Sequence, residues 1–228
     1  SGPGATNLIT GIANAQLDSI PILVITGQVN TNFLGTDAFQ ETDIFGITLP
    51  IVKHSYKITS AEDMCQIISE ALYIAKNGRP GPVLIDIPKD IGSEIIINYE
   101  NTSQNLINKL IGYRFNYKVS KKLIYSVLKA LRTAERPLLY VGGGTIASNA
   151  YRELFILAHL FAIPITTTLM GKGAFYEKDP LSVGMLGMHG TAYANFAVSE
   201  CDLLIAVGAR FDDRVTGKLD LFASSAKI

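Results

Sequence analysis

The sequence predicts an α/β protein with two doubly wound, parallel-sheet α/β domains, both of them partial. Buried strands, glycine turns and amphipathic helices alternate along most of the 228 residues, which is typical of right-handed crossovers between parallel strands. The strands are continuous apolar runs, such as residues 82–87 and 203–207, the pattern of strands that are covered on both faces. Residues 98–117 are rich in Asn, Gln, Tyr and Lys without a period, and we interpret them as a linker between the domains.

The first domain, residues 1–97, is predicted to contain a helix that runs to residue 17, a strand at 22–26, a helix at 61–76 and a strand at 82–87. Ser60 and Asp63 form a capping-box-like start for the second helix, and Gly78 and Pro80 end it. A long polar and aromatic loop at residues 28–43 follows the first strand. Loops of this length are usually functional or disordered, and the aromatic side chains favour a functional loop.

The second domain, residues 118–228, is predicted to contain a helix after Ser120, further helices at 148–161 and 192–200, and strands at 137–141, 163–167, 202–207 and 226–228. Ser120 and Thr191 are predicted to cap their helices. The apolar face of the first helix consists of Ile124, Val127, Leu128 and Leu131. The chain begins without Met and ends inside a predicted strand, so we expect it to be a piece of a longer polypeptide.

The composition excludes several classes of function. The formal net charge is zero and the basic residues are not clustered, which argues against nucleic acid or an anionic membrane as a partner. No apolar run approaches the ~20 residues of a membrane-spanning helix. Cys65 and Cys201 are expected to be reduced, buried thiols. The histidines are far apart in the sequence and no metal-ligand spacing occurs, so no protein-ligated metal is expected.

Loops that follow the strands of the second domain are candidates for binding an extended cofactor. They are Gly142, Gly143 and Gly144; Thr168, Leu169 and Met170; Leu186, Gly187, Met188 and His189; and Gly208, Arg210, Asp212 and Arg214. Ligands of open α/β sheets bind at this edge, and an elongated cofactor such as FAD suits it. The spacing of the dinucleotide fingerprint is missing, which disfavours NAD. The alternatives are glycines needed only for packing and a solvated loop whose charges pair with one another.

Some residues of the first domain have both a structural and a functional interpretation. Arg79, between Gly and Pro, either follows a helix stop or clamps an anionic ligand. Lys89, at the end of a strand, is either an exposed lysine or attracts a carboxylate substrate. Gln40 and Glu41 lie in the long loop, where either is able to hydrogen-bond a reacting group. No Ser/His/Asp or Cys/His set supports covalent catalysis by a side chain.

Taken together, the motifs resemble those of the large, catalytic subunits of acetolactate synthase (acetohydroxyacid synthase), a thiamine-diphosphate enzyme family. The resemblance covers nearly the whole chain, and it is weakest at residues 95–118. The segments that carry the resemblance are SGPGATNLITGIANAQLDSIPILVITGQV, GTDAFQETDIFGIT, GRPGPVLIDIPKDI, PLLYVGGG, TTLMGKGAF, LGMHGTAYAN and GARFDDRVTGKL. GTDAFQE and GARFDDRVTGK are specific to this family, whereas the GPG turn occurs in thiamine-diphosphate enzymes generally.

The resemblance implies that residues 1–97 are the C-terminal part of a pyrimidine-binding domain and residues 118–228 most of a central FAD-binding domain. The implied reaction condenses two pyruvates, or pyruvate and 2-oxobutyrate, to a 2-acetohydroxy acid with loss of CO2, in the biosynthesis of isoleucine and valine. Thiamine diphosphate performs this chemistry, Mg2+ tethers its diphosphate, and FAD is bound without net redox. The glutamate that activates thiamine diphosphate is expected upstream of Ser1 and the diphosphate domain beyond Ile228, so this piece alone is expected to be inactive.

Residue roles follow from the same resemblance. Phe39, Gln40 and Lys89 match residues of the substrate channel. Arg79 matches a flavin contact, as do the strand-end residues of the second domain named above. Asn30 stands where plant and fungal relatives usually have proline, which puts in doubt sensitivity to inhibitors that pack on that proline.

The implied partners are further large subunits, in a homodimer or tetramer, and a small regulatory subunit. The richness in Ile, Asn and Lys fits an algal plastid or the cytoplasm of a bacterium. The alternatives that remain are another thiamine-diphosphate enzyme, such as glyoxylate carboligase or pyruvate oxidase, and a non-catalytic nucleotide-binding module.

Overall fold

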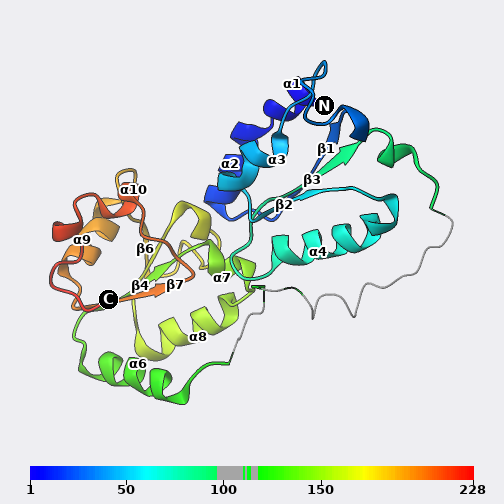
Figure 1. Cartoon of the computed structure of the whole chain (residues 1–228). Coiled ribbons are helices and arrows are strands. Elements are labelled where there is room, and N and C mark those ends of the chain that lie inside the picture. Colours follow the sequence, from blue (N-terminus) through cyan, green and yellow to red (C-terminus); the bar gives the residue numbers. More distant parts are fainter. Residues whose placement is uncertain (97–109, 111, 114–117) are drawn as a thin grey trace. The chain divides into compact units, whose positions relative to one another are not determined.

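The structure is a computed structural model that describes residues 1–96, 110, 112–113 and 118–228. The chain divides into two compact units, Ser1–Tyr117 and Lys118–Ile228. Each unit has its own parallel sheet with helices on both faces (Figure 1), which confirms the predicted fold class. Most of the linker predicted at residues 98–117 lies outside the described residues, and the domain boundaries stay a prediction.

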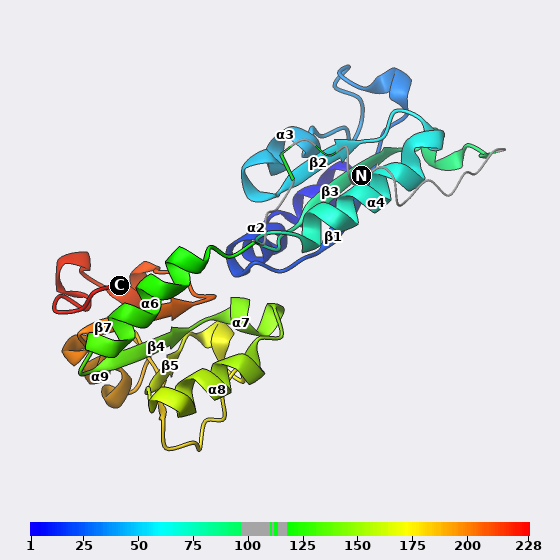
Figure 2. The same cartoon turned by 90° about the horizontal axis from the view of Figure 1, so that it is seen from below.

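The first unit is built on a three-stranded parallel sheet in the order β1-β3-β2. Its strands are β1 (Leu23–Gln28), β2 (His54–Lys57) and β3 (Val83–Pro88), and its helices are α1 (Gly2–Thr6), α2 (Ile9–Asp18), α3 (Ile44–Thr48) and α4 (Met64–Lys76). Side chains of a strand alternate between its faces. Val83 and Ile85 therefore pack under α4, which lies over the sheet in Figure 2, whereas Leu84 packs on the opposite face against Ile12 of α2 and Ile44 of α3.

The second unit is built on a four-stranded parallel sheet in the order β6-β5-β4-β7. The strands are β4 (Pro137–Val141), β5 (Ile165–Thr167), β6 (Ser182–Met185) and β7 (Leu203–Val207); the helices are α6 (Lys121–Thr133), α7 (Gly143–Ala147), α8 (Tyr151–Phe161), α9 (Ala192–Glu200) and α10 (Asp213–Thr216). α6 and α8 cover one face through Leu131 and Leu154, and α9 covers the other through Ala194 and Val198 (Figure 1).

In the second unit, the chain adds strands first on one side of β4 and then on the other. The chain moves from β4 to β5 and β6 on one side, and then crosses to β7 on the other side of β4. Lys227 extends the sheet beyond β7 through an isolated parallel bridge to Leu203, so the strand predicted at residues 226–228 is reduced to this bridge. A ligand crevice is expected at the carboxyl ends of β4 and β7, where the direction of the connections changes.

Several predicted elements of the first unit differ in the structure. The helix predicted to run to residue 17 is two helices, because α1 ends at Thr6 and α2 begins at Ile9. Gly27 does not end β1, because the parallel pairing continues to Gln28. The short strand β2 was not predicted. Ser60 caps the helix start as predicted, although its hydroxyl accepts from the amide of Glu62.

Three predictions for the second unit were also imprecise. The helix predicted at 148–161 is α8, which begins only at Tyr151, and the glycine loop before it contains an unpredicted short helix, α7, that begins at Gly143. Ser120 precedes α6, but its side chain makes no capping hydrogen bond. Of the predicted apolar face of α6, Leu131 is buried, whereas Ile124 and Val127 are each 48% exposed. Strand β6 was not predicted.

Among the described residues, no helix has both the length and the apolar character needed to span a bilayer. Within the same residues, no group of three or more His, Cys, Asp or Glu side chains is arranged to hold a metal ion. Cys65 and Cys201 are free thiols; Cys201 is buried as predicted, whereas Cys65 is only partly buried.

Candidate functional site

The carboxyl ends of β4 and β7 lie side by side and are joined by backbone hydrogen bonds. Val141 pairs with Val207 in parallel register. The amide of Gly142 donates to the carbonyl of Val207, and the amide of Gly144 donates to the carbonyl of Gly208, each at 2.9 Å. Two of the glycine amides that were expected to face a phosphate are therefore already used within the fold.

The glycines at this point are needed for close approach of the two backbones. A Cβ at Gly144 would lie 2.8 Å from Cα of Gly208, and a Cβ at Gly142 would overlap the carbonyl oxygen of Gly208. Gly208 also has φ +58°, a left-handed conformation that favours glycine. The packing interpretation of the triple glycine is thus correct for Gly142 and Gly144, and it does not exclude a ligand above them.

The loop after β5 rests on the end of β4. Thr168 donates its amide to the carbonyl of Val141 at 2.8 Å, and its hydroxyl accepts from the amide of Gly171 at 2.9 Å. Leu169 is 69% exposed and Met170 44% exposed. The loop therefore presents apolar side chains to solvent from a fixed backbone, as a surface for a planar ring would require.

The loop after β6 is held by the side chain of Asn195 on α9. Its amide oxygen accepts from the amide of Gly187 at 3.0 Å, and its NH2 group donates to the carbonyl of Gly187 at 3.1 Å. Gly187 has φ +97°. Leu186 is buried and anchors the loop. The amide of Met188 donates to the carbonyl of Arg214 at 2.9 Å, which joins this loop to the one after β7.

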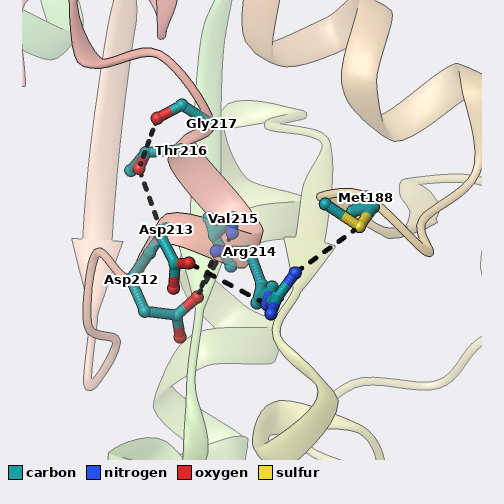
Figure 3. A network of polar contacts seen from close by, with 7 residues as sticks. All are labelled: Met188, Asp212, Asp213, Arg214, Val215, Thr216 and Gly217. Atoms are coloured by element: carbon teal, nitrogen blue, oxygen red, sulfur yellow. Dashed lines mark hydrogen bonds and ion pairs between the residues drawn. The ribbon is translucent and has the colours of Figure 1, made fainter.

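In the loop after β7, some charged side chains hold the backbone and others are exposed to solvent (Figure 3). Asp212 caps the short helix α10, because its Oδ1 accepts from the amides of Arg214 and Val215 at 3.1 and 3.2 Å. The Arg214 guanidinium is 3.9 Å from Sδ of Met188 and 3.9 Å from Oδ2 of Asp213. Arg214 and Asp213 thus form a long ion pair in which both side chains stay exposed.

Tyr140 in the centre of the second sheet holds the same loop from below. Its hydroxyl donates to the carbonyl of Arg210 at 2.7 Å, and its ring packs on Phe211 with 5.4 Å between the centroids. Burial raises the pKa of Tyr140 to about 12, so the phenol remains a donor at neutral pH. The side chains of Arg210 and Arg214 are exposed, whereas the backbone that carries them is fixed.

The structure brings the four predicted loops of the second unit together. Gly144 contacts Gly208, Gly143 lies against Met170, and Gly187 lies against Arg214. His189 is also part of this edge, directly after Met188. The arrangement is one continuous edge with exposed guanidinium groups and exposed apolar side chains, which is suitable for a ligand with phosphates and a planar ring.

In the first unit, the loop at residues 29–43 is fixed at both ends. Thr31 donates its amide to the carboxylate of Asp90 at 3.1 Å, and the carbonyl of Thr42 accepts from the side chain of Gln28 at 2.7 Å. Glu41 accepts from the amides of Gly35 and Ala38. These hydrogen bonds, that from Gly35 first, lower the pKa of Glu41. Glu41 therefore stabilises the loop and is not free to contact a reacting group.

Phe39, Gln40 and Lys89 lie at the carboxyl edge of the first sheet. Gln40 has φ +62°, and such strained residues are frequent at functional sites. Phe39 is 89% exposed. The amide of Lys89 donates to the carbonyl of Gln28 at 3.1 Å, and its side chain is exposed. Gln28 also donates to the carbonyl of Thr42. Lys89 and the end of the loop that carries Gln40 are therefore both hydrogen-bonded to Gln28.

Arg79 has a structural role that its sequence context does not reveal. Its Nε donates to Oγ of Ser19 at 2.8 Å, and one Nη donates to the carbonyls of Gln16 and Leu17 at 3.0 Å. The guanidinium therefore caps the C-terminus of α2. Arg79 belongs to the first unit, and the other predicted flavin contacts belong to the second.

Sequence reasoning missed the polar residues that hold these loops, chiefly Gln28, Asp86, Tyr140 and Asn195. Asp86 is an acid inside an apolar strand, and Asn195 lies on a helix next to the loop that it binds. Asp86 could have been found from the sequence, because it is a polar residue inside an apolar run. A buried carboxylate needs a hydrogen-bond partner. The partners themselves are distant in sequence and cannot be identified from it.

Comparison with known proteins identifies the class to which this fold and site belong. Residues 124–228 match the family described as "Thiamine pyrophosphate enzyme, central domain", and residues 1–47 match "Thiamine pyrophosphate enzyme, N-terminal TPP binding domain". The chain belongs to the thiamine pyrophosphate enzyme family.

Within that family, the chain is similar over its whole length to large subunits of acetolactate synthase. It is 60% identical over 228 residues to the "Acetolactate synthase large subunit" of Cyanidium caldarium, of which it covers 39%. The identity is also 60% to that of Porphyra purpurea, of which it covers 38%. It is 52% identical to "Acetolactate synthase 1, chloroplastic" of Oryza sativa subsp. japonica, covering 35% of that protein. The chain thus spans less than two fifths of the length of these relatives, and the predicted resemblance is confirmed.

The hydroxyl of Tyr140 can be tested as a support of the Arg210 loop. In Tyr140→Phe the carbonyl of Arg210 loses its buried donor, and we expect a loss of about 1 kcal/mol in the free energy of unfolding. Tyr151→Phe, a change of the same kind on half-exposed Tyr151 of α8, is the control and should be nearly neutral. Urea unfolding measures both variants, and equal stabilities would contradict the support by Tyr140.

A substitution of Gly2 tests whether its close contact with Gln40 is needed to hold the loop at residues 29–43. A Cβ at Gly2 would overlap the carbonyl oxygen of Gln40 and lie 2.9 Å from Oγ1 of Thr42. We expect Gly2→Ala to lower the free energy of unfolding by about 1–3 kcal/mol and to open residues 29–43 to protease. Gly4→Ala is the matched control, because it changes the same helix but its Cβ meets open space. Equal protease sensitivity of the two variants would contradict this prediction.

Proposed function

We propose that the protein that carries this chain is a thiamine-diphosphate-dependent acetolactate synthase, a carboligase of the transferase class. It condenses two pyruvates, or pyruvate and 2-oxobutyrate, to a 2-acetohydroxy acid and CO2. The main support is the identity of 60% over all 228 residues to proteins named as acetolactate synthase large subunits. The family-specific segments at Gln40 and at Arg210 lie on the two sheet edges where ligands of such folds bind.

Thiamine diphosphate, when bound, supplies the carbanion chemistry of this reaction. The residues of the first unit provide the surroundings of the substrate. The exposed ammonium group of Lys89 attracts the carboxylate of pyruvate. The side chain of Gln40 provides an amide that both donates and accepts hydrogen bonds, and the exposed ring of Phe39 excludes water from one side. Fixed loop ends at Thr31 and Thr42 keep these groups in position.

FAD is the proposed ligand of the edge of the second unit. The guanidinium groups of Arg210 and Arg214 bind its phosphates, and the apolar side chains of Leu169, Met170 and Met188 contact its ring system. Their exposure, from 44% to 69%, fits a ligand that covers them. Arg79 has a further role as a flavin contact in this proposal, besides its cap on α2.

Other parts of the proposal concern the complete protein. Mg2+ is held with the diphosphate by residues outside this chain. The complete protein assembles with a second large subunit and with a small regulatory subunit. The relatives come from red algae, from cyanobacteria and, as chloroplastic enzymes, from plants, which supports a plastid or bacterial cytoplasm as the location.

The reaction is tested with the complete protein that carries this sequence. With pyruvate, thiamine diphosphate, Mg2+ and FAD it is expected to release acetolactate and CO2 in equal amounts. Acetate or acetyl phosphate as the main product would indicate a pyruvate oxidase instead. The 228-residue chain alone is expected to form no acetolactate under the same conditions, and any turnover above the blank would contradict that expectation.

The flavin site is tested by removing a guanidinium group. Arg214→Ala loses charge-assisted hydrogen bonds to a phosphate, and we expect FAD to bind about tenfold more weakly. Arg152→Ala removes the same charge from the exposed face of α8 and serves as the control. Fluorescence titration of the apoprotein with FAD measures both affinities. If the two variants bind FAD equally well, Arg214 does not contact the flavin.

A further inference from the structure

Asp86 is a buried acid in the middle of an apolar strand. It is 1% exposed and lies in β3, between β1 and β2. Thr26 pairs with it in register on one side and Lys57, which is exposed, on the other. A carboxylate in this position is costly unless it is hydrogen-bonded. Its partners are the hydroxyl of Thr26, at 2.7 Å from Oδ1, and the NH2 group of Gln28, at 3.1 Å from Oδ2.

The position of Asp86 determines which way the amide of Gln28 points. Gln28 is 6% exposed, and its NH2 group donates both to Asp86 and to the carbonyl of Thr42, at 2.7 Å. Its amide oxygen accepts from the amide of Val29 at 2.9 Å. Carboxylate and carbonyl oxygens only accept here, so only the NH2 group fits between them. The flipped amide would place two acceptors against each other and leave the amide of Val29 facing a donor.

Thr42 is the point where the loop at residues 29–43 returns to the sheet. Gln40 lies two residues before it, in the left-handed conformation with φ +62°. The other end of the loop is held independently, by Asp90 on Thr31. The hydrogen bond from Gln28 to Thr42 therefore ties the end of the loop nearest to Gln40 to strand β1, in addition to the close packing of Gly2 against Gln40.

We propose that Asp86 and Gln28 are positioning residues for Gln40: the buried carboxylate orients the amide of Gln28, which holds the loop at Thr42. Neither side chain contacts the substrate. The effect on catalysis rests on the proposed acetolactate synthase function, whereas the effect on the loop does not. A misplacement of about 1 Å at a reacting centre costs on the order of 100-fold in rate, so a loosened Thr42 lowers kcat.

The first experiment uses Gln28→Met in the complete protein. Met fills a similar volume but donates no hydrogen bond, so the link from β1 to the carbonyl of Thr42 is lost, while the amide of Ile44 still donates to that carbonyl. We expect faster hydrogen exchange at residues 35–42 and a fall in kcat for pyruvate of about 10- to 100-fold, with thiamine diphosphate bound as tightly as before. Ser55→Ala is the matched control, because it removes a buried hydrogen bond, to Thr48 at 3.0 Å, from the neighbouring strand β2.

The second experiment exchanges the carboxylate and the amide between residues 86 and 28. It separates the effect on the position of the loop from the effect on the stability of the fold. Gln28→Glu alone places two carboxylates together and should destabilise the fold. In the double variant Gln28→Glu with Asp86→Asn, the amide of residue 86 donates to residue 28, so the link between the strands is restored. Residue 28 still offers no donor to the carbonyl of Thr42, so the link between the loop and β1 stays broken. We therefore expect the double variant to regain the unfolding temperature lost in Gln28→Glu, while exchange at residues 35–42 stays fast and kcat stays low.

These outcomes decide the proposal independently of the enzymatic function. If the complete wild-type protein forms no acetolactate, the proposed function fails, and the exchange data still show whether Gln28 holds the loop. If Gln28→Met exchanges at residues 35–42 as slowly as Ser55→Ala, the positioning role is wrong whatever the activity. If exchange becomes fast and kcat matches that of Ser55→Ala, Gln28 holds the loop but does not position Gln40 for catalysis, and the proposal is overturned.

Discussion

Parallel strand pairing is the constraint on which both candidate sites depend. Every strand pair in the described part of the chain is parallel, so the strands of one sheet all end at the same edge. The loops after β1 and β3 therefore meet in the first unit, and those after β4, β5, β6 and β7 meet in the second. Antiparallel pairing would send alternate loops to opposite edges. Residues far apart in sequence form one site because the backbone direction gathers them.

The polar side chains of these edges divide into two groups with different tasks. Acidic and amide side chains hold loop backbones: Glu41, Asp90, Asn195 and Asp212 all accept from backbone N–H groups. Lysine and arginine side chains at the same edges, those of Lys89, Arg210 and Arg214, are exposed. Because these carboxylates are occupied by backbone donors, the exposed ammonium and guanidinium groups are the side chains with donors left for a ligand. This division suits pyruvate and phosphate groups better than a cationic ligand.

The sequence allowed the central parts of the fold to be predicted and the edges only poorly. Long apolar runs, such as those of β3 and β7, identify buried strands. The missed strands, β2 (HSYK) and β6 (SVGM), lie at the edges of their sheets, where a shorter and less apolar strand suffices. Helix α7 was not predicted and α8 was predicted to begin at residue 148, because the break at Asn149, with φ +54°, has no glycine or proline to mark it. The candidate loops were selected from glycine and charge patterns, whereas the backbone partners of Asp212 and Glu41 could not be predicted from the sequence.

The triple glycine shows why a motif has to be interpreted through its hydrogen bonds. Gly142 and Gly144 donate their amides to β7, and they have no room for a Cβ. They are therefore part of the joint between β4 and β7, and a phosphate near them has to be bound chiefly by side chains. The exposed guanidinium groups on the loop after β7 meet this requirement, since one arginine offers several donors to one phosphate. In this fold the glycines bring the two strand ends together, and the arginines that follow β7 are the side chains that we propose to bind the ligand.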